Sequence, residues 1–580
     1  MVTVNTQCGT LRGSQEGGLS VFRGIPYARP PVGPLRFRPP QPPEPWGGVR
    51  DALRFGPAAP QDAQAMGSML DLGIGRTDED CLYLNVWTPA PDAGGRPVMV
   101  WIHGGAFILG AGSQHLYDGA TLARRGDVVV VTINYRLGAL GFLPLQDAQG
   151  QPLASGNEGL LDQIAALQWV QREIAAFGGD PDCVTIFGES AGAMSCAMLL
   201  GAPRARGLFQ RAILQSGSAN YLSSPAAAAG TRAGVLRELG LTPQQAEALM
   251  DLHAGRILGA QRRFLIGLLL HPRQVLAGNF LAPRRLGATL LLVAITGWRV
   301  LRRLLQWMSG SLHDLARMRR RGRGPSRWRA LWAPLFTRAG DAELPFEPVL
   351  DGALLPRHPF DAVADGLCAP VALLIGTNLD EQKLFAFMDP QARRLDEKTL
   401  LARCTRKLAH AGVRAGELAR RALQTYRAAR TERGQSTTPS ELWFAFENDR
   451  TMRWPALRLA ELQSAHQAQT YSYLFSWRSP ILGGALGACH ALELPFVFGT
   501  LDHPALRAFA GSHLPGAHEL AARMQDAWIQ FARTGNPSHP GLGTWPPYEP
   551  GRRATMILDR ECRVEYAPLE AERAFWEQVR

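Results

Sequence analysis

The stretch VTIFGESAGAMSCAMLL, residues 184–200, joins an apolar run to a helix-like run through a G-x-S-x-G pentapeptide, Gly188 to Gly192. Small residues on both sides of Ser190 allow a sharp turn from strand to helix, and that turn lifts the serine hydroxyl clear of the backbone. The N-terminus of the helix adds free N–H groups and a partial positive charge. The pentapeptide alone occurs by chance in many chains. With a strand before it and a helix after it, Ser190 is interpreted as a nucleophile.

Other apolar runs also end in Gly-rich turns. They are VMVWI (98–102), VVVVTI (128–133), AIL (212–214) and VALLI (371–375). Continuous Val, Ile and Leu without alternation predicts strands buried on both faces, as in a mostly parallel sheet covered by helices on both sides. Residues 160–176 have helical spacing, which fits a crossover between two strands. Functional groups collect at the carboxyl ends of such strands.

A serine hydroxyl needs a general base, and the base needs an acid that orients it. His490 lies on a Gly-rich loop after the strand-like run 471–477, and Glu381 follows the strand 371–375 in GTNLDEQKLF. In chains with this serine turn the order is serine, acid, histidine. Order and context favour Glu381 as the acid and leave its neighbour Asp380 as an alternative.

The run HGGAF, residues 103–107, also follows a predicted strand. Backbone N–H groups of Gly105, Ala106 and Ala191 could converge on a developing oxyanion. The alternative is that these residues form an ordinary tight turn, which the same sequence would also allow. One such donor contributes about 3–4 kcal/mol to transition-state stabilisation. His103 is expected to shape the loop and not to act as a base.

The charge of the chain is concentrated in one segment. The 580 residues carry a net charge of +12, and residues 256–338 hold 17 Arg, no Lys and one acidic residue, Asp314, which gives +16. The rest therefore carries 12 − 16 = −4. Because the basicity does not belong to the body of the chain, no nucleic-acid partner is expected. The apolar stretches in this segment are shorter than the ~20 residues that span a bilayer.

Eight cysteines are scattered without C-x-x-C pairs, which predicts free thiols and neither a structural zinc site nor a disulfide framework. The N-terminal MVTVNTQCGTLRG lacks a basic region followed by an apolar one, so we expect no secretory signal and a cytoplasmic location.

Further motifs are spread along most of the chain: FRGIPYARPPVGPLRFRPP (22–40), EDCLYLNVWTP (79–89), WIHGGAFILGAGS (101–113), NYRLGALGFL (134–143), GNEGLLDQIAALQWVQREIAAFGGDPDCVTIFGESAG (156–192), LQSGSAN (214–220) and HALELPFVFG (490–499). Together they resemble the motifs of the type-B carboxylesterase/lipase family, which includes bacterial para-nitrobenzyl-esterase-like enzymes and the cholinesterases. The resemblance implies an α/β-hydrolase fold in a single domain, 1–580. Within this domain we expect a basic, Leu/Arg-rich, lid-like helical insertion at 259–338, because this segment matches nothing in the family pattern.

The resemblance also implies the roles of individual residues. It gives Ser190 as nucleophile, His490 as base and Glu381 as acid, in preference to Asp380. It gives an oxyanion hole from the N–H groups of Gly105, Ala106 and Ala191, a hydrogen bond from Ser216 to the acid, and a structural ion pair between Arg36 and Glu79. Two departures matter: Gln382 stands where the family has the glycine of D-E-G, and the disulfide partner of the EDC cysteine is missing, so Cys81 is expected to be a free thiol.

The implied function is a serine carboxylesterase that cleaves short- to medium-chain or aryl esters of small molecules through an acyl-enzyme, without a metal or organic cofactor. The alternatives are a lipase with an interfacial lid, cleavage of amides or carbamates by the same residues, and a non-catalytic cholinesterase-like binding protein. The segment 259–338 is expected to add helices over the site mouth, with weak contact to a membrane or lipid surface as the alternative. No oligomeric state is predicted.

Overall fold

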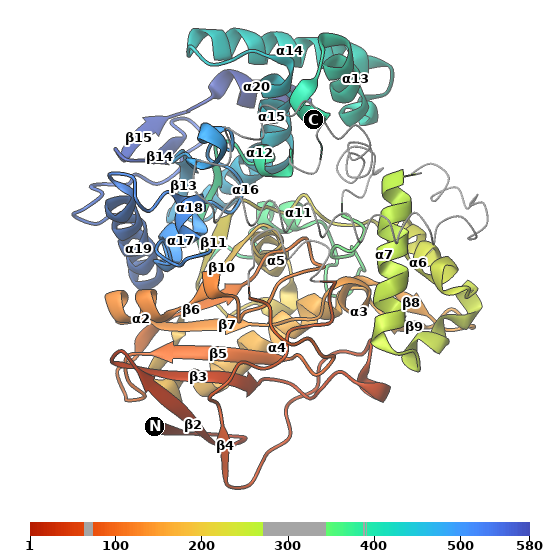
Figure 1. Cartoon of the computed structure of the whole chain (residues 1–580), viewed down its shortest axis with the longest axis vertical. Coiled ribbons are helices and arrows are strands. Elements are labelled where there is room, and N and C mark those ends of the chain that lie inside the picture. The colour runs from red at the N-terminus through yellow and green to blue at the C-terminus, as the bar shows by residue number, and fades with distance from the viewer. Residues whose placement is uncertain (63–72, 271–343, 387–388, 390, 580) are drawn as a thin grey trace, which may run out of the picture.

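One large sheet contains strands from both ends of the chain (Figure 1). The structure is a computed structural model that describes residues 1–62, 73–270, 344–386, 389 and 391–579. In spatial order the strands are β1 (Val2–Thr6), β2 (Gly9–Glu16), β3 (Leu19–Pro26), β5 (Tyr83–Thr88), β7 (Val129–Ile133), β6 (Arg96–Ile102), β10 (Gly179–Glu189), β11 (Arg211–Gln215), β12 (Ala372–Asn378), β13 (Thr470–Phe475), β14 (Ala554–Leu558) and β15 (Arg563–Tyr566). From β7 to β14 all neighbours are parallel, and the outer pairs are antiparallel. Each predicted apolar run is a strand of this sheet, so the mostly parallel architecture is confirmed.

Helices cover both faces of the sheet, as the absence of alternation in the strands predicts. Along β6, Val98, Val100 and Ile102 belong to one core and Met99 and Trp101 to the other. The first core lies under α4 (Glu158–Glu173), α5 (Ala191–Leu200) and α16 (Trp454–Ser464), and the second under α2 (Ala120–Gly126), α17 (Leu494–Phe498) and α19 (Ala517–Thr534). The predicted crossover helix is α4 with its 3₁₀ extension Ile174–Phe177.

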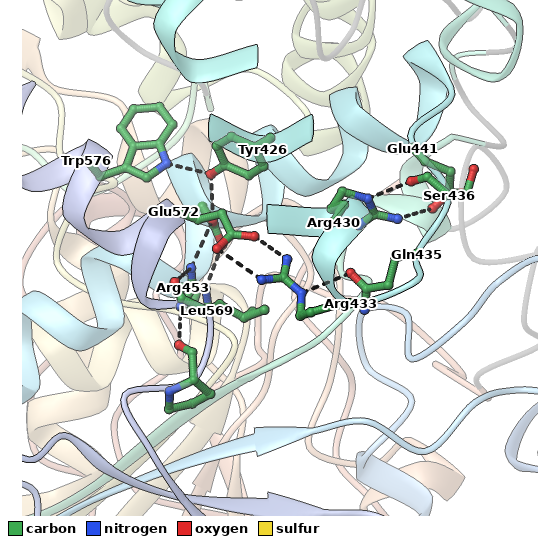
Figure 2. Close-up of polar contacts among 12 residues, drawn as sticks. Tyr426, Arg430, Arg433, Gln435, Ser436, Glu441, Arg453, Leu569, Glu572 and Trp576 are labelled. Atoms are coloured by element: carbon green, nitrogen blue, oxygen red, sulfur yellow. Dashed lines mark hydrogen bonds and ion pairs between the residues drawn. The ribbon is translucent and has the colours of Figure 1, made fainter. Parts of the chain in front are cut away.

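A third hydrophobic core lies among helices beyond the sheet, at the top of Figure 1. These helices are α13 (Glu397–Lys407), α14 (Ala415–Glu432), α15 (Pro439–Asn448) and the C-terminal α20 (Glu570–Gln578). Figure 2 shows polar contacts that join α14 to α20: Trp576 Nε1 donates to the Tyr426 hydroxyl at 2.8 Å, and Arg433, at the end of α14, pairs with Glu572. The Tyr426 hydroxyl donates in turn to Asp449, the first residue of the π-helix η11 (Asp449–Arg453).

The remaining α-helices and strands among the described residues are short or lie at the periphery. They are β4 (Val49–Asp51), β8 (Leu145–Gln146), β9 (Pro152–Ala154), α3 (Gly138–Phe142), α6 (Pro225–Leu239), α7 (Ala254–Leu270), α11 (Pro359–Ala364), α12 (Gln382–Phe385) and α18 (Arg507–Ala510). Among the described residues, no helix is long and apolar enough to cross a membrane.

The predicted insertion at 259–338 begins within α7. Ala260 and Phe264 of this helix are buried, and Gln261 Oε1 accepts a hydrogen bond from the Ala139 N–H at 2.8 Å. The first residues of the predicted segment therefore pack into the body of the protein. Residues 271–338 lie outside the described residues.

Candidate functional site: a serine turn and a histidine between carboxylates

Ser190 lies at a sharp turn between β10 and α5. Its backbone has φ 56° and ψ −126°, a conformation that is costly for a residue with a side chain. The Ser190 N–H donates to the Gln215 carbonyl of the neighbouring strand at 2.9 Å, which holds the turn to the sheet. At Gly192 a Cβ would lie 2.0 Å from the Ile102 carbonyl oxygen, so only glycine allows α5 to approach β6 this closely. The strand–turn–helix context predicted for Ser190 is confirmed.

His490 and Glu381 come from separate loops and meet in the interior. The His490 Nδ1 atom lies 2.7 Å from Glu381 Oε2, and both side chains are buried. The other Glu381 oxygen, Oε1, accepts from the N–H of Asn378, the last residue of β12, at 2.7 Å. A carboxylate that accepts from Nδ1–H fixes the tautomer and the orientation of the imidazole.

The opposite side of the imidazole faces the serine turn. His490 Nε2 lies 3.0 Å from Oε1 of Glu189, the residue that precedes Ser190. Burial alone would lower the pKa of His490, but the carboxylates of Glu189 and Glu381 outweigh burial and raise it well above its usual range. The histidine is therefore held between two carboxylates, with its Nε2 side next to the nucleophile turn.

A third buried carboxyl lies behind this pair. Glu493 accepts hydrogen bonds from Asn378 Nδ2 at 2.6 Å and from Gln215 Nε2 at 3.1 Å. Burial, reinforced by the charges of Glu189 and Glu381, raises the pKa of Glu493 to about 8. Glu493 therefore carries a proton at neutral pH, which limits the negative charge of the cluster.

Asp380, the alternative acid, holds the histidine loop by its backbone. Its Oδ2 accepts from the Ala488 N–H at 3.0 Å, its own N–H donates to the Ala488 carbonyl at 2.9 Å, and its Oδ1 pairs with Lys383 at 2.9 Å. The geometry thus places Glu381 on the imidazole and Asp380 on the loop that carries it.

The predicted oxyanion loop touches the serine turn. At Gly104 a Cβ would lie 2.6 Å from the Glu189 carbonyl oxygen and 3.1 Å from Ser190 Cβ. The next two residues, Gly105 and Ala106, have φ of 113° and 55°, so the loop folds back on itself beside the serine. Ala191 is the first residue of α5, where an N–H has no helical carbonyl to pair with.

His103 shapes this loop. Its Nδ1–H donates to the Gly104 carbonyl at 2.8 Å, and its ring stacks on Tyr135 at 4.4 Å between centroids. Burial lowers the pKa of His103 to about 4, so the ring stays neutral and packs as a neutral group.

Two further predicted contacts have different outcomes. Arg36 and Glu79 form a nearly buried pair at 2.6 Å. The hydrogen bond predicted from Ser216 to the acid is not formed: Ser216 Oγ is buried and has no partner among the described residues. The two Glu381 oxygens instead lie on the Asn378 N–H and on His490 Nδ1. All eight cysteines, Cys81 included, lie in the described part of the chain and are unpaired.

Sequence reasoning missed several residues around the imidazole. They are Glu189, Asn378, Glu493 and Phe385, whose ring centroid lies 5.1 Å from that of His490. Glu189 had a signal, because it occupies the variable position before the serine in G-x-S-x-G. Within the described residues no group of three or more His, Cys, Asp or Glu side chains is arranged to hold a metal ion.

Comparison with known proteins places this site in a family. The model of the carboxylesterase family matches residues 1–266 and 317–576. The chain belongs to the carboxylesterase family. It is 38% identical over 567 residues to the para-nitrobenzyl esterase of Bacillus subtilis (strain 168), with 97% of this chain and 96% of that protein covered. It is 34% identical to the phenmedipham hydrolase of Pseudarthrobacter oxydans, with 96% and 95% covered.

The solved structures agree with the sequence relatives. The Geobacillus stearothermophilus carboxylesterase EST55 at pH 6.2 has a TM-score of 0.76 and 37% identity, and the match covers 99% of this chain and 100% of that one. This carboxylesterase family member is therefore a serine carboxylesterase with the α/β-hydrolase fold, and it acts on small-molecule esters. The family model leaves 267–316 unmatched, a range that falls inside the predicted insertion.

Proposed function

We propose that this carboxylesterase cleaves its esters through an acyl-Ser190 intermediate, with His490 as general base and Glu381 as the acid that orients it. The observation that carries the proposal is the buried 2.7 Å contact between His490 Nδ1 and Glu381 Oε2, with Nε2 turned to the end of β10 beside Ser190. A nucleophile on a tight turn, a base and an orienting acid are the three parts that serine catalysis requires.

The reaction has two halves with the same groups. Nε2 of neutral His490 accepts the Ser190 proton as Oγ attacks the ester carbonyl, and Glu381 stabilises the imidazolium. The alcohol then leaves with that proton, and a water activated by His490 releases the acid and frees Ser190.

The oxyanion of each tetrahedral intermediate is assigned to the N–H groups of Gly105, Ala106 and Ala191. Support comes from the close approach of the Gly104 loop to Ser190 and from the position of Ala191 at the N-terminus of α5. Fixed donors of this kind stabilise developing charge without reorganisation.

The decisive test is turnover of para-nitrophenyl butyrate by the wild type and by Ser190→Ala. We expect kcat to fall by at least about 10³-fold, because the triad acts as a unit. Ser195→Ala is the matched control: Ser195 lies on the same helix, buried, and accepts from Gln163 Nε2 at 3.0 Å. Retained turnover in Ser190→Ala would refute the proposal.

We propose short- to medium-chain or aryl esters as substrates. Support comes from the relative that is named a para-nitrobenzyl esterase. A series of para-nitrophenyl esters of rising acyl length tests this, and turnover of phenmedipham, a carbamate, tests the alternative of carbamate cleavage. A preference for long acyl chains with activation at an interface would instead indicate a lipase.

We further propose a cytoplasmic location and weak contact of segment 259–338 with anionic lipid surfaces. The eight unpaired thiols support the first, and the +16 charge over 256–338, interleaved with short apolar stretches, supports the second. Cell fractionation tests the location. Co-sedimentation with anionic vesicles at rising salt tests the contact, and no binding at low salt would contradict it.

A further inference from the structure

Asn448, the last residue of α15, holds the turn that carries Glu381 from both sides. Its Nδ2 donates to the Leu379 carbonyl at 2.8 Å, and its Oδ1 accepts from the Gln382 N–H at 2.8 Å. The two backbone groups flank Glu381 in the chain. Asn448 is 8% exposed, so water does not compete freely for these bonds.

Gln382 adds a second connection at the position where the resemblance expects glycine. Its Nε2 donates to Thr451 Oγ1 at 3.0 Å, and the Thr451 hydroxyl donates to the Glu447 carbonyl at 2.6 Å. Thr451 is buried within the π-helix η11. A side chain at position 382 therefore connects the turn that carries Glu381, here called the acid turn, to α15 and η11. A glycine at this position could not make this connection.

The segment that supplies these partners is itself anchored. Asp449 of η11 pairs with Arg453 at 2.6 Å and accepts from the Tyr426 hydroxyl, which contacts Trp576 of the C-terminal helix (Figure 2). Insertions of a π turn into a helix are frequent at functional sites. Here the π turn lies between the third core and the loop of the acid.

We propose that Asn448, Gln382 and Thr451 form a polar bracket that positions Glu381 against His490. The inference rests on the proposed triad and deepens it. The bracket residues bind the backbone and each other, so they are positioning residues and not catalytic ones. Their effect passes through the 2.7 Å contact between Glu381 Oε2 and His490 Nδ1.

The physical reason lies in the geometry of the acid turn. Glu381 sits on a short connection between β12 and the single-turn helix α12. Removing the Asn448 amide leaves the Leu379 carbonyl and the Gln382 N–H without these partners in a partly buried region, which favours a shift of the turn toward other partners. A shift of about 1 Å at a catalytic group can cost about 10²-fold in rate.

The test compares Asn448→Ala with Asn157→Ala. Asn157 makes the same pair of bonds to another backbone segment, donating to the Val349 carbonyl and accepting from the Val349 N–H, both at 2.8 Å. Both variants lose a buried amide bracket and should lose stability. Only Asn448→Ala should lower kcat, by about 10–100-fold with KM within about twofold, because its bracket orients the acid.

A pH profile separates positioning from a merely structural role. The groups that face His490 are Glu189 from β10, Glu381 from the acid turn and the Phe385 ring from α12, with Glu493 behind them. A loosened Glu381 contact withdraws one of the two charges that favour the imidazolium. The acid limb of kcat/KM should therefore move to lower pH in Asn448→Ala and stay in place in Asn157→Ala.

Gln382→Ala provides a milder variant that keeps the backbone bond to Asn448 and removes the link to Thr451 without adding the backbone freedom of a glycine. It should show a smaller fall in kcat in the same direction, and it decides the question if Asn448→Ala does not fold. Unchanged kcat and an unchanged acid limb in a folded bracket variant would overturn the bracket. Absence of Ser190-dependent turnover in the wild type would instead overturn the proposed function.

Discussion

At the scale of single residues, the neighbours of His490 favour its protonated form, whereas catalysis requires the neutral ring. Its imidazole lies between Glu381 on Nδ1 and Glu189 on Nε2, and both charges favour the protonated ring. A protonated ring cannot accept the serine proton, so activity should be lost as the pH falls through this raised pKa. Glu381 is needed to orient the ring, whereas Glu189 occupies the nitrogen that must serve Ser190.

Glu189→Gln should therefore shift the acid limb of kcat/KM to lower pH. The substitution removes one charge that stabilises the imidazolium, which lowers the pKa of His490 and leaves more of it neutral at a given pH. A pH–rate profile measures the shift, with Glu565→Gln as the control: Glu565 is a partly exposed carboxylate on the edge strand β15, where it pairs with Arg563. An acid limb that stays in place would show that Glu189 does not set the histidine pKa.

The sequence was sufficient to predict the residues that sit at the ends of strands. Ser190, Glu381 and His490 each follow a recognisable apolar run, and the serine lies in a motif whose geometry is known. Asn448 and Glu493 could not be predicted in the same way, because their importance arises only when segments far apart in the chain meet. The hydrogen bond predicted from Ser216 to the acid is not formed, and Glu381 accepts from the backbone N–H of Asn378, which no motif pointed to.

At the scale of elements, continuous apolar runs predicted the parallel strands because each is buried on both faces. The helices of the third core, α13 to α15 and α20, were not predicted as a unit. An amphipathic helix shows which of its faces is apolar but not which partner covers that face. The core they form is visible only in the assembled structure.

The contact between α5 and β6 should not tolerate a methyl group. Gly192→Ala would place Cβ 2.0 Å from the Ile102 carbonyl oxygen, so α5 must move away from the sheet, and with it the Ser190 turn. We expect a loss of about 1–3 kcal/mol in the free energy of unfolding, and a fall in kcat, measured by urea denaturation and ester turnover.

Gly230→Ala is the control, because its Cβ would meet nothing within 4 Å in the interior of α6. It should stabilise the protein by about 0.5–1 kcal/mol. Equal behaviour of the two variants would contradict this account of the serine turn.

At the scale of the whole molecule, the C-terminal segment completes both the sheet and the third core. β15 forms one edge of the sheet and β1 the other, so the two ends of the chain lie far apart in the strand order. Beyond β15, α20 packs Phe575 and Trp576 into the third core, and its Glu572 pairs with Arg433 (Figure 2). The last helix therefore stabilises the layer that supports η11 and, through it, the acid turn.

Trp576→Ala should lower the free energy of unfolding more than a substitution at an exposed position of the same layer. The side chain is 5% exposed, and its removal leaves a cavity in the third core and a Tyr426 hydroxyl without its donor. A loss of about 3–5 kcal/mol is expected from urea denaturation. Trp576→Phe keeps most of the packing and removes only the Nε1 hydrogen bond, so it should cost about 1 kcal/mol. Val413→Ala, at a fully exposed position in the same layer, should change stability by less than about 0.5 kcal/mol. If Trp576→Ala were no more destabilising than Val413→Ala, α20 would not contribute to the stability of this layer. The contacts from the C-terminal helix toward the acid turn would then not stabilise that turn.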